Sequence, residues 1–398
     1  MDKPIFIFVE SNTSGTGRLF IETAKLLDFE PVLLCKNADI YDFPEYVKKH
    51  SYVVDTSDLS QLISLCKTLE QSRDIAGVFS SSEYYISIAA QLAQRLGKYS
   101  GNAKHIQNTR SKLFQRTQLE QHGLNPKYAI ARSVEEAVRH AQTIGFPVVV
   151  KPIHGSGSVG VRMCNCPLDV IEHSKHLLSK IDEDNTILVE EMVSGQEYSV
   201  EMFNGEVIGI TKKYVGDPPF FVEIGHEFPA DISTDNYQRI VNAAHTAVRE
   251  LGLTWGPIHV ELRLASLRPV IMEVNPRLAG DMIPVLIQQA YGIDLIEATI
   301  QLAAGRSVRI TKTHDRVAAI RFFMPKSSGI FHGMNNWSFD KWKDTIVRFE
   351  ITKKPGSKID LHGDFTDRVG YVICVAETSK DIHRVIEEIC SSVQINMQ

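Results

Sequence analysis

The sequence predicts an α/β protein with an N-terminal parallel sheet and a mixed α+β C-terminal part. Three observations support this prediction. Strand-like apolar runs alternate with helical patterns over the first hundred residues, a β-rich stretch with turn signals follows, and strands and a helix end the chain. Strands that alternate with helices form parallel sheets with helices on their faces. The length of 398 residues suggests two to three domains.

The first hundred residues contain four strand-like runs, PIFIFV, PVLLC, SYVVD and IAGVFS, with helical spacing in DLSQLISLCKTLEQSR and ISIAAQLAQRLG. A loop with Gly15 and Gly17 leads to a helix that we expect from about Arg18, which is how a dinucleotide-binding fold begins. However, Phe20 stands where the fingerprint needs its third glycine, and no acidic residue ends the second strand. We therefore do not expect an NAD site.

A polar connector, helical from about Ser111, leads into the middle of the chain. There VEEAVRHAQTIGFPVVVKPIHGSGSVGVRM predicts a helix, a strand ending at Lys151, a glycine-rich loop and a second strand. A β-rich stretch from Thr186, an amphipathic helix bounded by Gly252, a hairpin and a further helix follow, ending near Gly305. The last ninety residues predict the strands AAIRFFM and VGYVICVAE and the helix KDIHRVIEEIC.

The composition is that of an ordinary globular protein, with 43% hydrophobic and 23% charged residues. A net charge of −5 and the lack of basic runs interleaved with aromatics argue against nucleic acid as a partner. Only Cys164 and Cys166 of the six cysteines are close together, so we expect neither a zinc site nor a disulfide. No run approaches the roughly 20 apolar residues of a membrane helix, and the first run lacks a basic signal-peptide start. We expect a cytoplasmic protein without membrane contact.

The segment PIHVELRLASLRPVIMEVNPR carries two glutamates that we expect to face each other. Apolar and polar residues alternate on both sides of ASLR, which predicts a β-hairpin with one apolar face. With the turn centred on Leu267, Glu261 lies opposite Glu273, and Asn275 shares their face. Opposed carboxylates repel unless a cation lies between them, and these oxygen ligands suit Mg²⁺ held together with phosphates. The alternative is a solvated polar face on which Arg263 neutralises one carboxylate.

A glycine-rich loop follows the buried strand VVVK. Lys151 ends the strand, and Gly155, Gly157 and Gly160 follow, interleaved with serines. Backbone N–H groups of such a loop can bind anionic oxygens. Because the lysine precedes the loop and a strand follows it, this is not a P-loop. The alternative is a flexible hairpin turn.

Three glutamates, Glu190, Glu191 and Glu197, surround the turn in EEMVSGQEYSVE. The first two end an apolar strand, and the third follows shortly after. An adenine needs backbone donors and acceptors in a narrow apolar slot, and a ribose diol needs a carboxylate, so this segment is a candidate nucleoside site. The alternative is an acidic hinge at the surface.

The order of these features resembles the ATP-grasp superfamily, most strongly in VVVKP, VEEMVSGQEYSVE and IMEVNPRLAGD, and the resemblance extends over essentially the whole chain. It implies an ATP-grasp fold with a pre-ATP-grasp domain over residues 1–105, a nucleotide-binding core over 106–310 and a C-terminal α+β segment over 311–398. A mobile lid subdomain is implied over about 126–192. The end of the chain, DRVGYVICVAE, is similar to that of carboxylate–amine ligases and biotin-carboxylase-like members.

The resemblance implies a role for each matching residue. Lys112 and Lys151 would contact the phosphates of ATP, and Glu197 would hold the ribose. Arg277 and Gly280 would face the acyl-phosphate region, and we assign catalysis to these two residues and Lys151. The mobile loop and the adenine slot would consist of Ser156, Gly157, Ser158, Val159, Gly160, Glu190, Glu191 and Val193. The metal ligands would be Glu261, Glu273 and Asn275, typically for two Mg²⁺ ions, which Mn²⁺ could replace.

We expect the acceptor substrate at the carboxyl ends of the N-terminal strands, because ligands collect in the crevice there. The candidate contacts, in and after the first and fourth strands, are Glu10, Ser11, Asn12, Thr13, Gly15 and Glu83. The base that assists the amine is left unassigned, with Glu83 as one candidate. His226 resembles a substrate-side histidine of L-amino-acid ligases. The alternatives are a tight turn that caps the first helix and a structural histidine.

The resemblance implies an ATP-dependent carboxylate–amine ligase that forms an amide or peptide bond through an acyl phosphate and releases ADP and phosphate. Its partners would be a small carboxylic or amino acid and an amine, and a homodimer is compatible with the family. One alternative is a biotin-carboxylase-like enzyme that uses bicarbonate, although the chain lacks an AMKM biotin-carrier segment and a QRR strand. The other is a non-catalytic nucleotide-binding module, although every metal ligand and phosphate lysine is present. The sequence does not identify either substrate.

Overall fold

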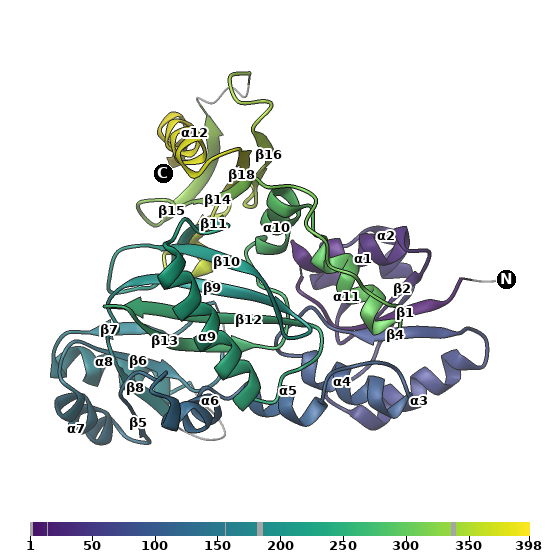
Figure 1. The fold of residues 1–398 in the computed structure, drawn as a ribbon, viewed down its shortest axis with the longest axis horizontal. Coiled ribbons are helices and arrows are strands. Elements are labelled where there is room, and N and C mark those ends of the chain that lie inside the picture. Colours follow the sequence, from purple (N-terminus) through teal and green to yellow (C-terminus); the bar gives the residue numbers. More distant parts are fainter. Residues whose placement is uncertain (1–2, 14, 156, 181–185, 336–339) are drawn as a thin grey trace.

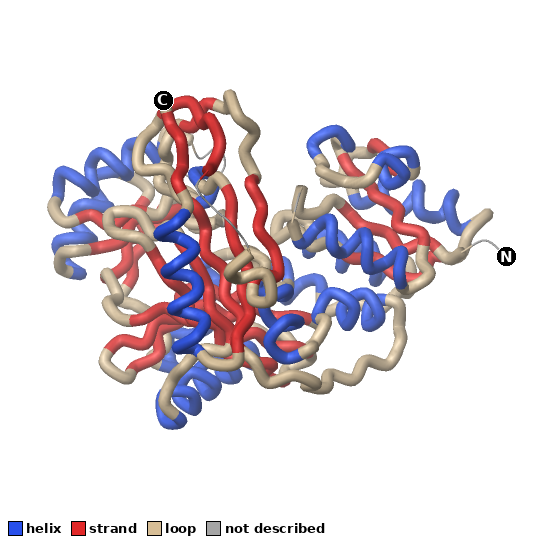
Figure 2. Tube along the Cα trace, turned by 90° about the horizontal axis from the view of Figure 1, so that it is seen from above, coloured by secondary structure: helices blue, strands red, loops and turns tan. Residues whose placement is uncertain are grey.

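The computed structural model describes residues 3–13, 15–155, 157–180, 186–335 and 340–398 (Figure 1). In these residues the strands form four sheets. Figure 2 shows the N-terminal sheet on one side of the molecule, with most of the other strands gathered on the opposite side. One predicted site residue, Ser156, lies outside the described residues.

The N-terminal sheet is parallel, as predicted from the alternation of strands and helices. Its order is β3 (Ser51–Val53), β2 (Glu30–Cys35), β1 (Ile5–Val9) and β4 (Ile75–Phe79). The whole of β1 is buried, as expected for a central parallel strand covered on both faces. The helices of this part are α1 (Thr16–Leu26), η1 (Ala38–Ile40), α2 (Glu45–Lys49), α3 (Leu59–Glu70) and α4 (Ile86–Arg95).

A small antiparallel sheet with its own apolar core follows the helices α5 (Ala103–Thr109), α6 (Lys112–Leu119) and η2 (Glu120–His122). Its order is β5 (Tyr128–Ala131), β8 (Ile187–Glu191), β6 (Val148–Pro152) and β7 (Arg162–Cys164). Helices α7 (Val134–Ile144) and α8 (Pro167–Leu178) pack on it. The predicted strand, glycine loop and strand are therefore present as β6, its following loop and β7.

The largest sheet is antiparallel and runs through most of the second half of the chain. Its order is β13 (Arg268–Asn275), β12 (Pro257–Ala265), β9 (Gln196–Phe203), β10 (Glu206–Val215), β11 (Glu223–Phe228), β14 (Val317–Phe323), β18 (Gly370–Ala376) and β16 (Ile346–Ile351). Helix α9 (Thr234–Glu250) packs on β9, β12 and β13. Because β14, β16 and β18 extend this sheet, it continues across the domain boundary that we placed at residue 310.

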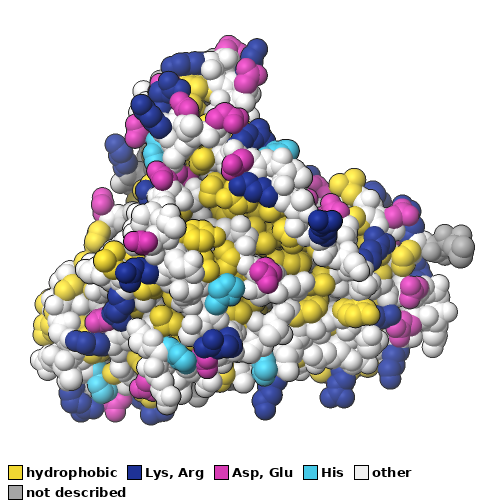
Figure 3. Space-filling model, viewed as in Figure 1, with side chains coloured by type: hydrophobic (Ala, Val, Ile, Leu, Met, Phe, Trp, Pro, Cys, Tyr) yellow, Lys and Arg dark blue, Asp and Glu magenta, His cyan; other side chains and the backbone are white. Residues whose placement is uncertain are grey.

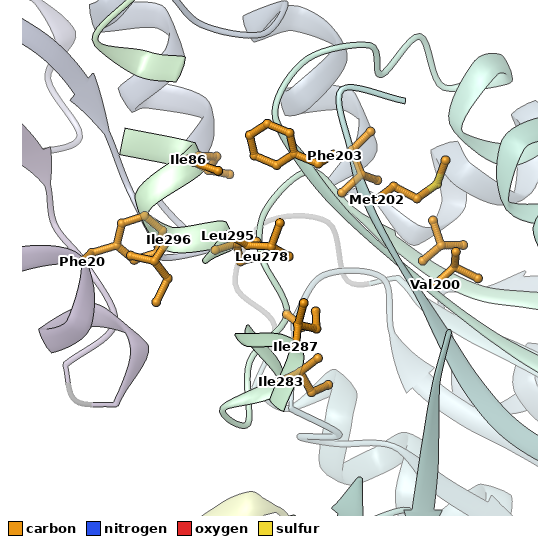
Figure 4. Close-up of a cluster of buried hydrophobic side chains, with 14 of the residues drawn as sticks. Phe20, Ile86, Val200, Met202, Phe203, Leu278, Ile283, Ile287, Leu295 and Ile296 are labelled. Atoms are coloured by element: carbon orange, nitrogen blue, oxygen red, sulfur yellow. The ribbon is translucent and has the colours of Figure 1, made fainter. Parts of the chain in front are cut away.

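Two helices join the N-terminal sheet to the largest sheet. Helix α10 (Ile283–Tyr291) packs on β11 and β14, and α11 (Leu295–Ala303) packs on α1 and β4. Figure 4 shows the shared core: Phe20 of α1 lies beside Ile296, while Leu278 and Ile287 lie toward the strand that carries Met202. This packing holds the carboxyl ends of the N-terminal strands beside the end of β13.

The C-terminal part adds a three-stranded sheet in the order β17 (Lys358–Ile359), β15 (Gly329–Asn335) and β19 (Gln394–Met397), together with η3 (Phe365–Asp367) and α12 (Ser379–Ser392). The short strands of this sheet were not predicted. Figure 3 shows apolar side chains gathered near the middle of the visible face, with charged side chains around its margin. Within the described part of the chain, no helix combines the length and apolar character needed to cross a membrane.

Candidate active site

Two glutamates face each other on the β12–β13 hairpin, as predicted. Glu261 is in register with Glu273. The turn residues Ser266 and Leu267 both have positive φ, of 46° and 72°, so the turn is centred between them rather than on Leu267. The pairing nevertheless holds, because a bulge places Met272 as an extra residue on β13 and shifts the register by one.

Cations hold both of these carboxylates. Lys112 Nζ donates to Glu273 Oε1 at 2.8 Å. Glu261 lies 2.9 Å from His259 Nε2 and 3.2 Å from Lys213 Nζ. Burial opposes the charge of Glu261, but Lys213 and His259 outweigh it and hold its pKa well below the usual value. Burial raises the pKa of Glu273, and the carboxylates of Glu83 and Glu261 add to this rise, which Lys112 opposes without cancelling.

Because burial and nearby carboxylates oppose the charge of Glu273, a divalent cation beside it would stabilise the ionised carboxylate. Asn275 follows on the same strand, is buried, and is in register with His259. Two carboxylates and an amide oxygen are the donors that Mg²⁺ prefers. The predicted ligands therefore fit a divalent cation in chemistry; Glu261 and Glu273 line the pocket described below, and Asn275 is not among its lining residues.

The predicted phosphate lysine, Lys151, contacts a buried carboxylate. Its Nζ lies 2.6 Å from Glu190 Oε2, and Arg116 Nε lies 2.7 Å from Glu190 Oε1. Arg116, which we did not predict, is fully buried and also donates to the Met272 carbonyl at 2.8 Å. Burial opposes the charge of Glu190, but the two cations outweigh it and lower its pKa to about 2. Burial lowers the pKa of Lys151, and Arg116 and Lys112 reinforce this effect, so an anionic ligand would stabilise the charged amine.

A row of paired charges crosses four adjacent strands of the largest sheet, β12, β9, β10 and β11. Lys213 on β10 and Arg263 on β12 both pair with Glu197 on β9, at 3.2 and 2.9 Å. Lys213 is buried and also contacts Glu223 at 2.7 Å. The alternative in which Arg263 neutralises a hairpin carboxylate does not hold for Glu261, whose partners are His259 and Lys213. We missed Lys213 and Glu223, although the alternation in GITKKYV marks Lys213 as a residue of the polar face.

Many of these side chains line one pocket between the small antiparallel sheet and the largest sheet. Most predicted nucleotide, metal and catalytic residues lie in its wall: Lys112, Lys151, Gly157, Ser158, Val159, Glu190, Glu191, Val193, Glu197, Glu261, Glu273 and Arg277. Apolar side chains that we did not predict add a slot: Val149, Val161, Met192, Phe221 and Met272. Gly160, at the end of the glycine-rich loop, is not among the lining residues. Its carbonyl lies 2.9 Å from His173 Nε2.

Arg277 lines this pocket and is held by Glu83 of the N-terminal part. Its Nη2 donates to Glu83 Oε2 at 2.5 Å, and its Nη1 donates to the Leu278 carbonyl at 2.9 Å. Glu83 is thus placed as the partner of Arg277, which leaves it poorly suited to serve as a free base. A Cβ built on Gly280 would meet no described atom within 4 Å, so there is open space beside this residue.

His226 lies in a second buried charge cluster next to Gly280. Its Nε2 lies 3.0 Å from Asp281 Oδ2, and Arg368 from the C-terminal part binds both oxygens of Asp281, at 2.6 and 2.9 Å. His226, Glu223 and Asp281 have ligand atoms within 4.8 Å of one another. Because Arg368 also lies 3.3 Å from Glu223, cations already compensate these carboxylates and the cluster carries no argument for a metal.

The loop after β1 lies close to this cluster. Within this loop, the Glu10 side chain is buried and does not face the pocket side of the loop. The Glu10 carboxylate accepts hydrogen bonds from Tyr41, from Thr56 Oγ1 at 2.9 Å and from the Lys36 amide at 2.8 Å. It therefore supports the loop from beneath. The other predicted loop residues have the following contacts: Ser11 and Asn12 bond to Ser81 Oγ at 2.6 and 3.0 Å, the Thr13 carbonyl accepts from Asp42 at 2.9 Å, and Gly15 approaches Met282.

Comparisons with known proteins identify two domain families in this chain. The ATP-grasp domain matches residues 144–285, and the L-amino acid ligase C-terminal domain 2 matches residues 321–398. The uncharacterized protein y4rH of Sinorhizobium fredii is 33% identical over 386 residues, which cover 96% of this chain and 81% of that protein.

Two solved structures show the same fold. The L-amino acid ligase from Bacillus licheniformis superposes with a TM-score of 0.84 at 20% identity and full coverage of both chains. The biotin carboxylase domain of Hydrogenobacter thermophilus 2-oxoglutarate carboxylase, solved with MgADP and bicarbonate, has a TM-score of 0.69 at 16% identity, covering 98% of this chain and 90% of that one. The chain therefore belongs to the ATP-grasp family of ligases and carries the C-terminal domain of the L-amino acid ligases.

Proposed function

We propose that this protein is an ATP-dependent carboxylate–amine ligase, which joins a small carboxylic or amino acid to an amine through an acyl phosphate and releases ADP and phosphate. One observation carries the proposal. Opposed carboxylates, Glu261 and Glu273, form one wall of a pocket whose other wall presents the incompletely compensated Lys151, and Arg277 lines the same pocket. This arrangement suits a magnesium–triphosphate whose terminal phosphate points toward Arg277.

The apolar side chains of the pocket would bind the adenosine end of ATP. Val149, Met192 and Met272 offer apolar surface for an adenine, and the Met192 carbonyl and the Val193 amide would supply polar groups at its edge. Glu197 lies in the same wall and is anchored by Lys213 and Arg263, so its carboxylate is held in place for a ribose diol.

The chain's own groups then account for phosphoryl transfer to a carboxylate. Lys112 and Lys151 would neutralise phosphate oxygens, and backbone N–H groups of the loop that contains Gly157 and Ser158 would add hydrogen bonds. Arg277, oriented by Glu83, would bind the transferred phosphoryl group or the acyl oxygen. When bound at Glu261, Glu273 and Asn275, Mg²⁺ would neutralise charge on the β and γ oxygens.

The amine would attack from the side of Gly280, where open space lies beside the His226–Asp281–Arg368 cluster. Carboxylates and a guanidinium placed side by side can bind the ammonium and the carboxylate of an amino acid. The attacking nitrogen must be the free amine: it forms a bond to the acyl carbon, the C–O bond to phosphate breaks, and the proton lost from nitrogen passes to phosphate or solvent. Exclusion of water protects the acyl phosphate from hydrolysis. The L-amino acid ligase C-terminal domain, which supplies Arg368, supports an amino acid as one substrate.

The test is to incubate the purified protein with Mg-ATP and a matrix of amino acids and small carboxylates, and to quantify ADP, AMP and phosphate. We expect ADP with equimolar phosphate that depends on a specific acid and amine. ADP formed only with bicarbonate would replace the ligase by a carboxylase. AMP as the product would exclude the acyl-phosphate route.

A further inference from the structure

A segment of the C-terminal part reaches from the surface to the rim of the nucleotide pocket. We name residues 361–368, between β17 and β18, the clasp. It is built as a rigid unit, because the buried Asp367 accepts the amides of His362 and Gly363 at 2.9 and 2.8 Å. Asp364 accepts from the Thr366 amide at 2.8 Å, which begins the helical turn η3.

The clasp contacts the glycine-rich loop through Phe365. A Cβ added to Gly157 would lie 2.7 Å from Phe365 Cδ1 and 3.0 Å from Cε1, so the ring lies directly against the Gly157 backbone. Gly157 has a φ of 65° and lines the pocket on its other side. Phe365 remains 45% exposed, so its ring lies at the surface. The side of the ring that is shielded from solvent contacts the glycine-rich loop.

A second loop, residues 216–222, joins the clasp to the glycine-rich loop. The Gly363 backbone lies against the ring of Phe220, where an added Cβ would be 2.3 Å from Cγ. The next residue, Phe221, lines the pocket, and its carbonyl accepts a hydrogen bond from Ser158 Oγ at 3.1 Å. The three segments therefore contact one another at the pocket rim.

The end of the clasp lies on the acceptor side of the pocket. Arg368 binds Asp281 and donates to the Glu223 carbonyl at 2.9 Å. One short, rigid segment thus contacts the loop over the nucleotide with Phe365 and the charge cluster beside Gly280 with Arg368. The mechanism proposed above uses Arg368 on the acceptor side and gives Phe365 no role.

We propose that the clasp holds the glycine-rich loop against bound nucleotide and that Phe365 is the positioning residue for this closure. The proposal rests on the proposed function for the identity of the ligand. Because Phe365 and Arg368 share one rigid segment, groups bound beside Asp281 stabilise the closed loop, and loss of the ring opens the pocket to water. The acyl phosphate is then lost to hydrolysis before the amine attacks.

The experiment compares Phe365→Ala, Phe365→Tyr and the wild type. We expect Phe365→Ala to release a fluorescent ATP analogue with Mg²⁺ about two- to tenfold faster, the range for losing one aromatic contact, and to form less amide per ADP. Phe365→Tyr keeps the ring and should restore both values. Tyr237→Ala is the matched control, since Tyr237 is a comparably exposed aromatic residue on α9.

Amide hydrogen exchange over residues 157–163 supplies a second readout on the loop itself. Faster exchange in nucleotide-bound Phe365→Ala, at an unchanged melting temperature, is the expected result. Equal release rates and equal exchange in wild type and Phe365→Ala would overturn the proposal. If the wild type forms no amide with any substrate pair, the proposed function fails, while release rates and exchange still decide whether the clasp holds the loop.

Discussion

Glu190→Gln tests whether the buried Arg116–Glu190–Lys151 cluster depends on the Glu190 charge. Glutamine keeps the shape of the side chain but leaves two buried cations without their shared anion. The lowering of the Glu190 pKa from 4.5 to about 2 corresponds to roughly 3 kcal/mol, and the side chain is only 3% exposed, so solvent screening is small. Breaking a buried ion pair by removing one partner costs about 3–5 kcal/mol, which agrees.

The pH dependence of this loss has a definite sign. A carboxylate whose pKa is lowered by folding contributes its full stabilisation above the unfolded value, here 4.5, and loses it as pH falls toward the folded value, about 2. The difference in unfolding free energy between wild type and Glu190→Gln should therefore be constant from pH 5 to 8 and shrink below about pH 4.5.

Urea unfolding at several pH values measures both quantities. Glu191→Gln is the matched control, because this neighbour is partly exposed, pairs with Arg268 at 3.3 Å, and should cost less than about 1 kcal/mol. A loss below about 1 kcal/mol for Glu190→Gln at pH 7, or one that does not change on acidification, would refute the electrostatic account of this cluster.

Three further predictions concern the pocket. Glu273→Gln should lower ADP formation by more than about 100-fold while the melting temperature changes little, because one of two opposed carboxylates is removed; near-normal turnover would exclude it as a metal ligand. Lys151→Ala should raise the KM for ATP or slow turnover by roughly 10- to 100-fold, the value of a charged hydrogen bond; unchanged kinetics would remove its phosphate role. Lys213→Met should cost about 3–5 kcal/mol in urea unfolding, because Glu197, Glu223 and Glu261 lose a shared cation; a loss near zero would contradict the observed pairing.

Local sequence patterns were sufficient for the parallel N-terminal sheet, the glycine-rich loop after Lys151 and the pairing of Glu261 with Glu273. Each depends on a short-range signal: strands alternating with helices, a lysine before clustered glycines, or period-two alternation around a turn. The bulge at Met272 was not predictable in this way, since the sequence placed the turn at Leu267 and reached the same pairing without it.

The charge partners required the tertiary structure. Arg116 and Glu190 are 74 residues apart, and Arg368 and Glu223 are 145 residues apart, so no periodicity relates them. We expected Glu10 to contact a substrate, but its carboxylate accepts hydrogen bonds from Tyr41 and Thr56. These partners lie 31 and 46 residues away in the sequence, so only the folded N-terminal part shows the contacts.

The sequence by itself determined which residues share a strand face and where the glycine-rich loop lies between two strands, because these properties arise within a few residues. Only the tertiary structure decided which cation compensates which buried carboxylate, and that the C-terminal part reaches the pocket through Phe365 and Arg368. The physical reason is that burial makes each charge dependent on its nearest partner, and folding brings those partners from distant elements of the chain.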